Sequence, residues 1–542
     1  MSTKTKFSRE ELGPSLSAMS ALRTIVETPF YGNNVVEVKT LAEAYEMAKN
    51  STGTVVTDLP IEQPEKLGLP ADAKVLLFND GAVTGRTAAA RRIVGDEGVD
   101  SDTLNRRVME AVYDTRWGTM YHAQVFVGLD TDFMVRAHLL IPEGEENILY
   151  NWMLNFQPCT PEYEELYAKS KPIDGEGDIY VFSDPQWSHE EHPLGLTYFD
   201  SQHNCAALLG MRYFGEHKKG TLTLAWSIAN RHNYACCHGG CKTFNPDGDS
   251  PFTLAVFGLS GSGKSTLTHA KHDGKYDIRV LHDDAFIIST KDFSSVALEP
   301  SYFDKTADYP ASSPDNKYLL TVQNCGVTLD ENGKKIIVSE DIRNGNGRAV
   351  KSRLWSPNRV DVLHQPMSAV AWIMKDPVLP PLVRVHDPKI AALMGATLST
   401  KRTSAERLAK GVDPNKLVIE PYANPFRTYP LNDDYRKFLA LFEQGIDGYI
   451  LNTGFFLDQK VPKEVTIAAI ESLVDGTTEW KPLKAMKGME YAVIPGFEVP
   501  DDADYRQGVH HSLENRTNFL KEQKGFNRLP DDAIALLLDL EK

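Results

Sequence analysis

The stretch "FTLAVFGLSGSGKSTLTHA", residues 252–270, places an apolar run, a glycine-rich loop and a polar helix-like segment in direct succession. Residues 258–265 follow the phosphate-loop pattern Gly-x4-Gly-Lys-Ser. A loop of this kind between a strand and a helix points backbone N–H groups at phosphate oxygens, and the helix N-terminus adds positive charge. The alternative, a glycine-rich turn with an exposed lysine, does not account for the segments on its two sides. The stretch therefore predicts an α/β fold built around a nucleotide site.

The loop supplies the first candidate site residues. The Lys264 ammonium is expected at the outer phosphates, and the Ser265 hydroxyl is expected to ligate Mg²⁺. Ser260 and Lys264 are also expected to take part in the chemical step. The residues predicted to hold the nucleotide here are Leu259, Ser260, Gly261, Ser262, Gly263, Lys264, Ser265 and Thr266.

Length and composition limit the kind of protein. At 542 residues the chain exceeds the size at which one hydrophobic core keeps growing, so two domains are expected. Acidic residues outnumber basic ones by 74 to 58, which argues against broad binding to nucleic acid or to an anionic membrane. Six cysteines in so long a chain predict no disulfide framework. The polar start "MSTKTKFSREELGPS" lacks the apolar core of a signal peptide, and no apolar run reaches membrane-spanning length, so a cytoplasmic protein is expected.

Strand-like and helix-like segments are mixed along the chain. "AKVLLFN", "FMVRAHLLI" and "GYILNTG" are typical of strands, whereas "TAAARRIVG", "SDTLNRRVMEAVYDTRW" and "TIAAIESLV" are typical of helices. "FNPDGDSP", residues 244–251, is the best candidate for a boundary because it combines two prolines, a glycine and two aspartates. We therefore expect an N-terminal domain of residues 1–247 and a C-terminal, nucleotide-binding domain of residues 248–542.

A pair of adjacent carboxylates follows the loop. "IRVLHDDAFII", residues 278–288, is an apolar strand pattern interrupted by His282, Asp283 and Asp284. Two carboxylates at a strand end suit a Mg²⁺ ion held by phosphates. Aspartate is also common at an ordinary strand-to-turn junction. With the phosphate loop upstream, the metal site is the favoured interpretation.

A third feature precedes the loop. "MRYFGEHKKGTLTLAWSIANRHNYACCHGGC", residues 211–241, brings together two lysines, a histidine and three cysteines. A zinc site built from the cysteines and His238 has a spacing that fits no common structural-zinc pattern. Buried free cysteines are the usual alternative, and Lys-Lys-Gly by itself is an ordinary exposed turn.

Taken together, these segments resemble ATP-dependent phosphoenolpyruvate carboxykinase. "YFGEHKKG", "CCHGGC", "GLSGSGKST" and "HDD" follow the order of that family's Tyr-x-Gly-Glu-x-Lys-Lys-Gly segment, histidine, specialised phosphate loop and Asp-Asp pair. The resemblance can be followed over most of the chain. It implies a two-domain fold with an N-terminal substrate-binding domain. It also implies the conversion of oxaloacetate and ATP to phosphoenolpyruvate, CO₂ and ADP, in gluconeogenesis or anaplerosis.

The resemblance implies two divalent metal ions, Mn²⁺ and Mg²⁺. A lysine ligates a metal only when neutral, so the pKa of Lys219 would be lowered by the metal and by neighbouring cations such as Lys218, which is itself implied to be catalytic. The implied ligands are Lys219, His238 and Asp284 for Mn²⁺, and Ser265 and Asp283 for Mg²⁺.

Further site residues follow from the resemblance. "GAVTGRTAAARR" is similar to the family's Thr-Gly-Arg segment, which implies that Arg86 grips a substrate carboxylate. Tyr213 would contact the other end of the substrate or the departing CO₂. For another active-site arginine, Arg348 and Arg353 are both candidates, and Arg353 keeps the family's proline four residues on. "ALEPSYFDKT" and "YILNTGFFLDQKVPKEVT" imply nucleotide-side roles for Glu299, Lys305, Lys460 and Thr466.

The chain also departs from the family pattern. Residues 283–288 read Asp-Asp-Ala-Phe-Ile-Ile where the family has Asp-Asp-Glu-His-Gly-Trp, and Cys237-His238-Gly239 replaces Met-His-Cys. These differences predict a divergent member of the family.

Three alternatives remain beside the carboxykinase interpretation. A P-loop kinase of another small acid or of a protein would have no use for Lys219, His238 and Arg86. A nucleotide-binding homologue without turnover is suggested by the altered residues after Asp284. The loop leaves GTP or pyrophosphate open as the phosphoryl donor, and the sequence leaves open a monomer or a homo-oligomer.

Overall fold

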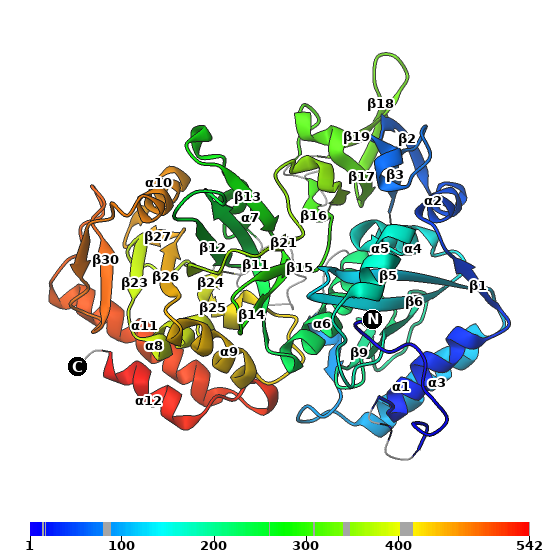
Figure 1. The fold of residues 1–542 in the computed structure, drawn as a ribbon, viewed down its shortest axis with the longest axis horizontal. Helices are drawn as coiled ribbons and strands as arrows, with labels where there is room; N and C mark the ends of the chain where they lie inside the picture. The colour runs from blue at the N-terminus through cyan, green and yellow to red at the C-terminus, as the bar shows by residue number, and fades with distance from the viewer. Residues whose placement is uncertain are drawn as a thin grey trace. The chain divides into compact units, whose positions relative to one another are not determined.

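A computed structural model describes residues 1–13, 16, 18–79, 88–259, 261–306, 309–339, 347–401 and 416–540. The chain forms two compact units, each of mixed α/β structure (Figure 1). The first unit comprises Met1–Ile228 and Leu298–Pro357. The second comprises Ala229–Ala297, Asn358–Thr403 and Ala409–Lys542. The mixed α/β character expected from the sequence is confirmed, whereas the functional division at residues 247 and 248 stays a prediction.

The described part of the first unit holds an eight-stranded sheet, a five-stranded sheet and a hairpin. The larger sheet has the order β1-β5-β6-β8-β10-β9-β4 with β7 beside β5, and the smaller has the order β16-β20-β17-β3-β2. The strands are β1 (Val35–Val38), β2 (Val55–Pro60), β3 (Lys74–Phe78), β4 (Arg91–Ile93), β5 (Met120–Asp130), β6 (Phe133–Pro142), β7 (Gln157–Pro158), β8 (Ile179–Asp184), β9 (Leu196–Asp200), β10 (Cys205–Leu209), β16 (Tyr302–Lys305), β17 (Leu319–Gln323), β20 (Arg348–Lys351) and the hairpin β18 (Gly326–Leu329) and β19 (Lys335–Val338). The α-helices are α1 (Ala21–Glu27), α2 (Leu41–Asn50), α3 (Ser101–Thr115), α4 (Glu146–Asn155), α5 (Pro161–Lys169) and α6 (Phe214–Arg231), and the 3₁₀ helices include η1 (Thr28–Tyr31), η3 (Ala88–Ala90), η6 (Pro314–Tyr318) and η7 (Arg353–Trp355).

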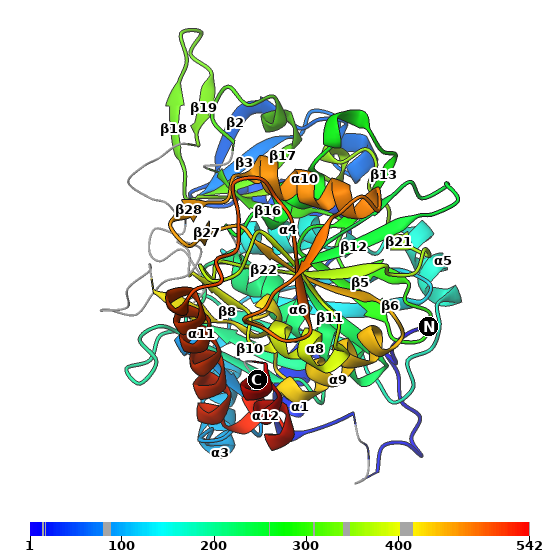
Figure 2. The same ribbon diagram turned by 90° about the vertical axis from the view of Figure 1, so that its left-hand side faces the viewer.

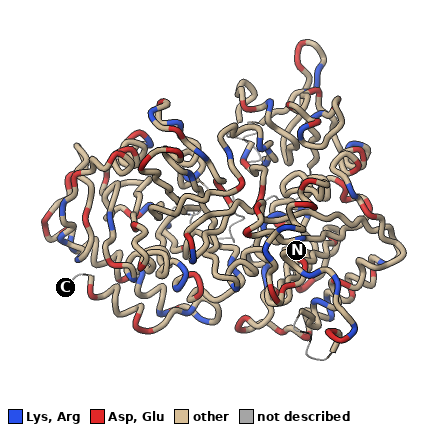
Figure 3. The backbone as a smooth tube through the Cα atoms, in the orientation of Figure 1, with Lys and Arg blue, Asp and Glu red and all other residues tan. Residues whose placement is uncertain are grey.

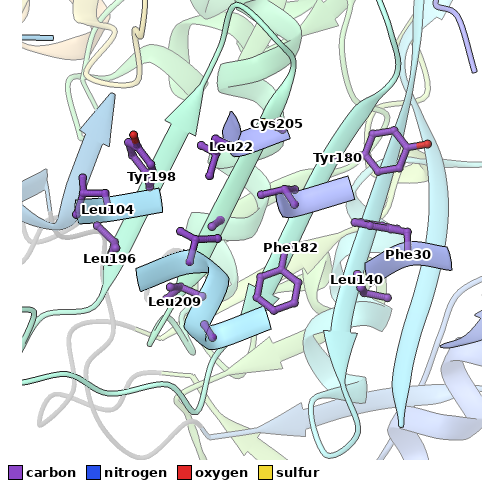
Figure 4. Packing of buried hydrophobic residues seen from close by; sticks show 14 of the residues in the cluster. Leu22, Phe30, Leu104, Leu140, Tyr180, Phe182, Leu196, Tyr198, Cys205 and Leu209 are labelled. Carbon is purple, nitrogen blue, oxygen red and sulfur yellow. The ribbon is translucent and has the colours of Figure 1, made fainter. Parts of the chain in front are cut away.

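One face of the larger sheet carries a buried apolar core. Figure 4 shows Leu22 of α1 and Leu104 of α3 lying against residues of β8, β9 and β10, among them Phe182, Leu196 and Leu209. Burying a side chain of this kind contributes about 2 kcal/mol. Every second residue of these strands therefore faces the helices, such as Tyr180 and Phe182 in β8.

The described part of the second unit is built on an eleven-stranded sheet. Its order is β21-β15-β14-β11-β12-β22-β26-β23-β30-β29, with β13 beside β11. Its strands are β11 (Tyr234–Phe244), β12 (Phe252–Phe257), β13 (Ile278–His282), β14 (Ala285–Ser289), β15 (Ser295–Ala297), β21 (Val362–Leu363), β22 (Ala369–Met374), β23 (Leu382–Val385), β26 (Asp447–Asn452), β29 (Trp480–Pro482) and β30 (Met489–Ala492), and the two small hairpins are β24 (Ser399–Lys401) with β25 (Leu417–Ile419) and β27 (Phe455–Phe456) with β28 (Gln459–Lys460). The α-helices are α7 (Lys264–His269), α8 (Pro388–Ala396), α9 (Leu431–Glu443), α10 (Lys463–Val474), α11 (Ala503–Glu522) and α12 (Asp531–Asp539), and the 3₁₀ helices are η4 (His272–Gly274), η8 (Pro421–Ala423) and η9 (Gly525–Asn527).

Three neighbouring parallel strands position the phosphate loop. The apolar run before the loop forms β12, which is labelled in Figures 1 and 2. The strand β22 lies between β12 and β26 and runs parallel to both. The carboxyl ends of parallel strands meet at one edge of a sheet, which is where α/β proteins bind ligands. The phosphate loop, Lys375 and Thr453 follow these three strands and are therefore neighbours at that edge.

Most of the quoted helix and strand patterns agree with the structure, and one does not. "SDTLNRRVMEAVYDTRW" forms α3, whose first turn is capped by the Asp100 carboxylate, and "TIAAIESLV" lies in α10. The prediction of a helix over "TAAARRIVG" was wrong, because its described residues form the 3₁₀ turn η3 and then β4. The strand pairs in parallel with β9, and Arg91 forms an ion pair with Glu216 at 2.9 Å. Tertiary pairing has therefore overridden the helix propensity of the alanines.

The distribution of charged residues and the hydropathy of the helices are two further features of the described chain. Lys and Arg are interspersed with Asp and Glu along the described chain (Figure 3). Among the described helices, none combines the length and the apolar character needed to cross a bilayer.

Candidate nucleotide and metal site

The phosphate loop connects β12 to α7. Gly263 has φ +99°, a left-handed conformation that glycine adopts without strain, and it immediately precedes the first residue of α7, Lys264. The backbone N–H of Ser262 donates to the Leu259 carbonyl at 3.0 Å. The Lys264 side chain is buried, so its ammonium is held at the loop.

Three polar side chains meet beside this loop. Asp284 Oδ1 lies 3.0 Å from His238 Nε2 and 3.4 Å from Lys264 Nζ. His238 belongs to β11, and Asp284 lies in the turn between β13 and β14. The Nδ1 atom of His238 is hydrogen-bonded to the Ala423 carbonyl, so Nδ1 carries a proton and Nε2 faces the carboxylate. The residues predicted at the phosphates and at the metal thus share one carboxylate.

The turn before β14 aims its two carboxylates at different partners. His282 Nδ1 accepts hydrogen bonds from the Asp284 backbone N–H at 3.1 Å and from that of the next residue at 3.3 Å. Asp283 Oδ2 lies 3.4 Å from His269 Nε2 on α7. Burial alone would raise the pKa of Asp283, but His269 and His282 hold it well below its ordinary value. Asp283 is therefore an anion that faces α7, while Asp284 faces Lys264 and His238.

Side chains after β22 and β26 form hydrogen bonds with the phosphate loop. Thr453 Oγ1 donates to the Ser262 carbonyl at 2.8 Å, and Lys375 Nζ donates to the Gly261 carbonyl at 3.2 Å. The Asn452 amide bridges the same two strand ends through carbonyls after β22 and in β27. None of these residues was predicted from the sequence. Their position directly at the ends of buried apolar strands is the signal that could have found them.

A buried lysine fixes the other end of α7. Lys242 of β11 donates to the Leu267 carbonyl at 2.7 Å and lies 2.9 Å from His272 Nε2. His272 Nδ1 in turn bonds the Glu471 carboxylate at 2.8 Å. Burial lowers the pKa of Lys242 to about 7. This lysine too was not predicted, because its partners come from distant segments.

In the first unit, a buried ion pair contains two predicted site residues. Lys218 Nζ lies 3.0 Å from Glu299 Oε1, and both side chains are fully buried. The Asn155 amide donates to Glu299 Oε2 at 2.6 Å. Lys219, the next residue of α6, is partly buried, with its ammonium 5.8 Å from the Trp226 ring centre. The cation expected beside Lys219 is therefore balanced by a carboxylate.

The two candidate arginines differ in their surroundings. Arg348 lies buried in β20, whereas Arg353 of η7 donates to Gln157 Oε1 at 3.2 Å and to Tyr163 Oη at 3.4 Å. Tyr213 is buried beside the first residue of α6. The remaining predicted residues are Lys305 at the end of β16, Ser265 and Thr266 in α7, Thr466 buried in α10 and Lys460 exposed in β28.

The predicted residues therefore fall into two groups. Arg86 and Ser260 lie outside the described residues. The first unit carries Tyr213, Lys218, Lys219, Glu299, Lys305 and Arg353, and the second carries His238, Leu259, Gly261, Ser262, Gly263, Lys264, Ser265, Thr266, Asp283, Asp284, Lys460 and Thr466.

The three cysteines beside His238 are buried free thiols, the alternative to a zinc site. Burial raises the pKa of Cys236, Cys237 and Cys241, which keeps all three protonated. Within the described ranges, no group of three or more His, Cys, Asp and Glu side chains is arranged to hold a metal ion.

Comparison with known proteins decides the family. The sequence profile of phosphoenolpyruvate carboxykinase matches residues 46–502. The chain belongs to the phosphoenolpyruvate carboxykinase family. Relatives of this family include phosphoenolpyruvate carboxykinase (ATP) of Aeropyrum pernix, 27% identical over 77% of this chain and 82% of the relative, and that of Kluyveromyces lactis, 22% identical over 79% and 80%. The glycosomal phosphoenolpyruvate carboxykinase (ATP) of Trypanosoma cruzi is 26% identical over 40% of this chain and 46% of the relative. The carboxykinase family thus accounts for the order of motifs, and the low identities agree with a divergent member.

Proposed function

We propose that the protein is an ATP-dependent phosphoenolpyruvate carboxykinase that converts oxaloacetate and ATP to phosphoenolpyruvate, CO₂ and ADP. The observation that carries the proposal is the Asp284 carboxylate, shared by the phosphate-loop Lys264 and by His238. A P-loop kinase that does not decarboxylate its substrate has no need for a histidine in the position of His238. The proposal includes the division into a substrate-binding domain of residues 1–247 and a nucleotide-binding domain of residues 248–542.

The side chains at Asp284 fit a divalent metal ion. His238 presents Nε2 to the carboxylate because Nδ1 is engaged with a backbone carbonyl, the usual arrangement of a ligating histidine. His238 Nε2 and Asp284 Oδ1 lie 3.0 Å apart, close enough for one divalent ion to bind both. We assign these two residues to Mn²⁺, with Lys219 as the third protein ligand. Ser265 and Asp283 are assigned to the Mg²⁺ that accompanies the nucleotide.

The chemistry divides between the metal and the protein groups. Breaking the carbon–carbon bond of oxaloacetate releases CO₂ and leaves the electron pair as an enolate, whose oxygen then attacks the γ-phosphorus as the bond to ADP breaks. A bound divalent ion supplies Lewis acidity at that oxygen. Lys264 neutralises charge on the phosphates, and Asp284 orients its ammonium. The backbone of the loop, braced by Thr453, holds the phosphate chain in line.

The substrate end of the reaction is assigned to two residues of the N-terminal domain. Arg86 grips a carboxylate of oxaloacetate, and Tyr213 contacts its other end or CO₂. Lys218, Arg353 and Ser260 complete the proposed catalytic set. The proposed nucleotide contacts beyond the loop are Glu299, Lys305, Lys460 and Thr466. The proposal also includes a cytoplasmic location and either a monomer or a homo-oligomer.

The proposal is tested by an acceptor panel. Purified protein is supplied with phosphoenolpyruvate, bicarbonate, Mn²⁺, Mg²⁺ and one of ADP, GDP or phosphate, and oxaloacetate is detected through malate dehydrogenase. We expect turnover with ADP. Turnover with GDP or phosphate instead would contradict the choice of ATP as donor, and no turnover with any acceptor would contradict the enzymatic function.

Two variants test the metal assignment. His238→Gln and Lys219→Met should abolish Mn²⁺-dependent oxaloacetate formation while ADP binding, measured by calorimetry, stays within about twofold of the wild type. His232→Gln, a change at the partly buried histidine just after α6, is the matched control. If Lys219→Met were as active as the control, Lys219 would not be a metal ligand.

A further inference from the structure

The strand next to the phosphate loop ends in a lysine that reaches the loop. Lys375 is the first residue after β22, the strand between β12 and β26. Its ammonium donates to the Gly261 carbonyl at 3.2 Å, and its side chain is half-buried. The strand of this lysine and β11, the strand that carries His238, are therefore the two neighbours of β12 in the sheet.

The turn after β26 keeps Lys375 against the loop. A Cβ atom at Gly454 would lie 3.1 Å from the Cβ and 3.2 Å from the Cα of Lys375, so the turn passes directly over the base of this side chain. A larger residue at 454 would have to displace it. The adjacent Thr453 is bonded to the loop at Ser262. The ends of β22 and β26 therefore fix the position of Lys375.

A second cation lies close to the first. The backbone N–H of Lys375 donates to the Ser399 carbonyl at 3.0 Å, which brings in the strand β24 that ends at Lys401. Burial first, and then the charge of Lys401, lower the pKa of Lys375. Among the described residues, no ion pair joins either lysine to a carboxylate, and Lys375 bonds the Gly261 carbonyl instead. Their mutual repulsion is relieved when an anion binds between or beside them.

We propose that Lys375 and Lys401 form a cationic subsite that binds the phosphate chain of the nucleotide together with the loop and Lys264. The inference rests on the proposed function in taking a nucleotide polyphosphate as the ligand of the loop. The subsite adds affinity for phosphate charge and none for the base. Lys375 makes the direct contact, and Lys401 acts through its charge.

Calorimetric binding to the full-length chain, measured with Mg²⁺ at low and at high salt, tests this subsite without turnover. The probes are ADP, tripolyphosphate and adenosine. Lys375→Gln keeps an amide donor for the Gly261 carbonyl but removes the charge, and Lys375→Arg keeps the charge. Lys401→Gln removes the second charge. Lys389→Gln, at an exposed lysine of α8, is the matched control.

We expect Lys375→Gln to raise the Kd for ADP and tripolyphosphate about three- to tenfold at low salt and Lys401→Gln to raise it about twofold, with smaller effects at high salt. Adenosine binding should not change, and Lys375→Arg should bind ADP nearly as the wild type does. The proposal is overturned if Lys375→Gln matches the control, if ADP and adenosine weaken equally, or if the wild type binds neither ADP nor tripolyphosphate. A wild type that binds ADP but forms no oxaloacetate contradicts the proposed reaction, while the Kd values of the variants still decide the subsite.

Discussion

Replacing Lys242 with methionine should change how the stability of the protein depends on pH. The side chain is 3% exposed, and burial lowers its pKa from 10.5 to about 7. His272 lies beside its ammonium, with Glu471 behind the imidazole. Methionine has nearly the same length and stays apolar at every pH. The substitution therefore removes one titrating group from a buried site at the end of α7.

The sign of the effect follows from proton binding. Between about pH 7 and pH 10, the unfolded chain keeps the proton of Lys242 whereas the folded chain has lost it, so the unfolded state binds more protons and stability rises with pH. One pKa unit corresponds to about 1.4 kcal/mol, so the full shift is worth about 5 kcal/mol. Integrated between about pH 7 and pH 9, the wild type should gain about 2 kcal/mol relative to Lys242→Met. For a unit of this size, that is about 5 °C in melting temperature.

Thermal unfolding of both proteins at several pH values in this window measures the difference. Comparing the two proteins at each pH cancels the other titrating groups. Lys271→Met, which alters an exposed lysine nearby, should give a curve parallel to that of the wild type. If the melting temperatures of the wild type and Lys242→Met also run parallel from about pH 7 to pH 9, Lys242 does not deprotonate in the folded state and the reasoning is refuted.

Three further substitutions test the site and its support. Asp284→Asn should lower kcat for oxaloacetate formation by about a hundredfold or more and change the Kd for ADP far less, because the carboxylate acts in the chemical step; equal losses in both would place Asp284 in nucleotide binding alone. Glu299→Gln leaves Lys218 buried without its counter-charge and should cost about 3–5 kcal/mol, so a melting temperature equal to that of the wild type would contradict the ion pair. Thr453→Val removes the bond to the Ser262 carbonyl and should raise the Kd for ADP about fivefold, whereas Thr453→Ser should not.

Local patterns predicted the elements whose neighbours are close in the sequence. The apolar run before Gly258 gave β12, and the loop and α7 followed as the pattern indicated. The five-stranded sheet of the first unit shows what local patterns do not predict, namely which distant strands pair. Its strand β17 pairs in parallel with β3, Thr321 opposite Leu76, although the two strands lie far apart in the chain. No periodicity of a single segment encodes that pairing, which is set by long-range burial.

The candidate site shows the same limit. Motif order pointed to His238, Lys264 and Asp284, and the structure joins them within the second unit. The partner of Lys218 could not be read from the sequence, because Glu299 lies 81 residues away (299 − 218) on a different element. The position of Lys375 at the loop likewise depends on the sheet order, which places β22 beside β12. Motifs identify the residues that carry chemistry, while the residues that position them depend on topology.

The altered residues after Asp284 form the strand β14, which pairs with β11, the strand that carries His238. Ala285 begins β14, and its partner across the antiparallel ladder is His238 itself. Paired residues project to the same face of a sheet, so the side chain at 285 is a neighbour of the imidazole. The rest of β14 is buried, and the centre of the Phe286 ring lies 6.0 Å from that of Phe257 at the end of β12. The apolar residues 285–288 thus pack into the sheet that carries the loop. The preceding turn still contains both carboxylates, Asp283 and Asp284. With an alanine beside His238, Asp284 supplies the negative charge facing that imidazole, which makes this carboxylate the residue on which the proposed metal site depends most.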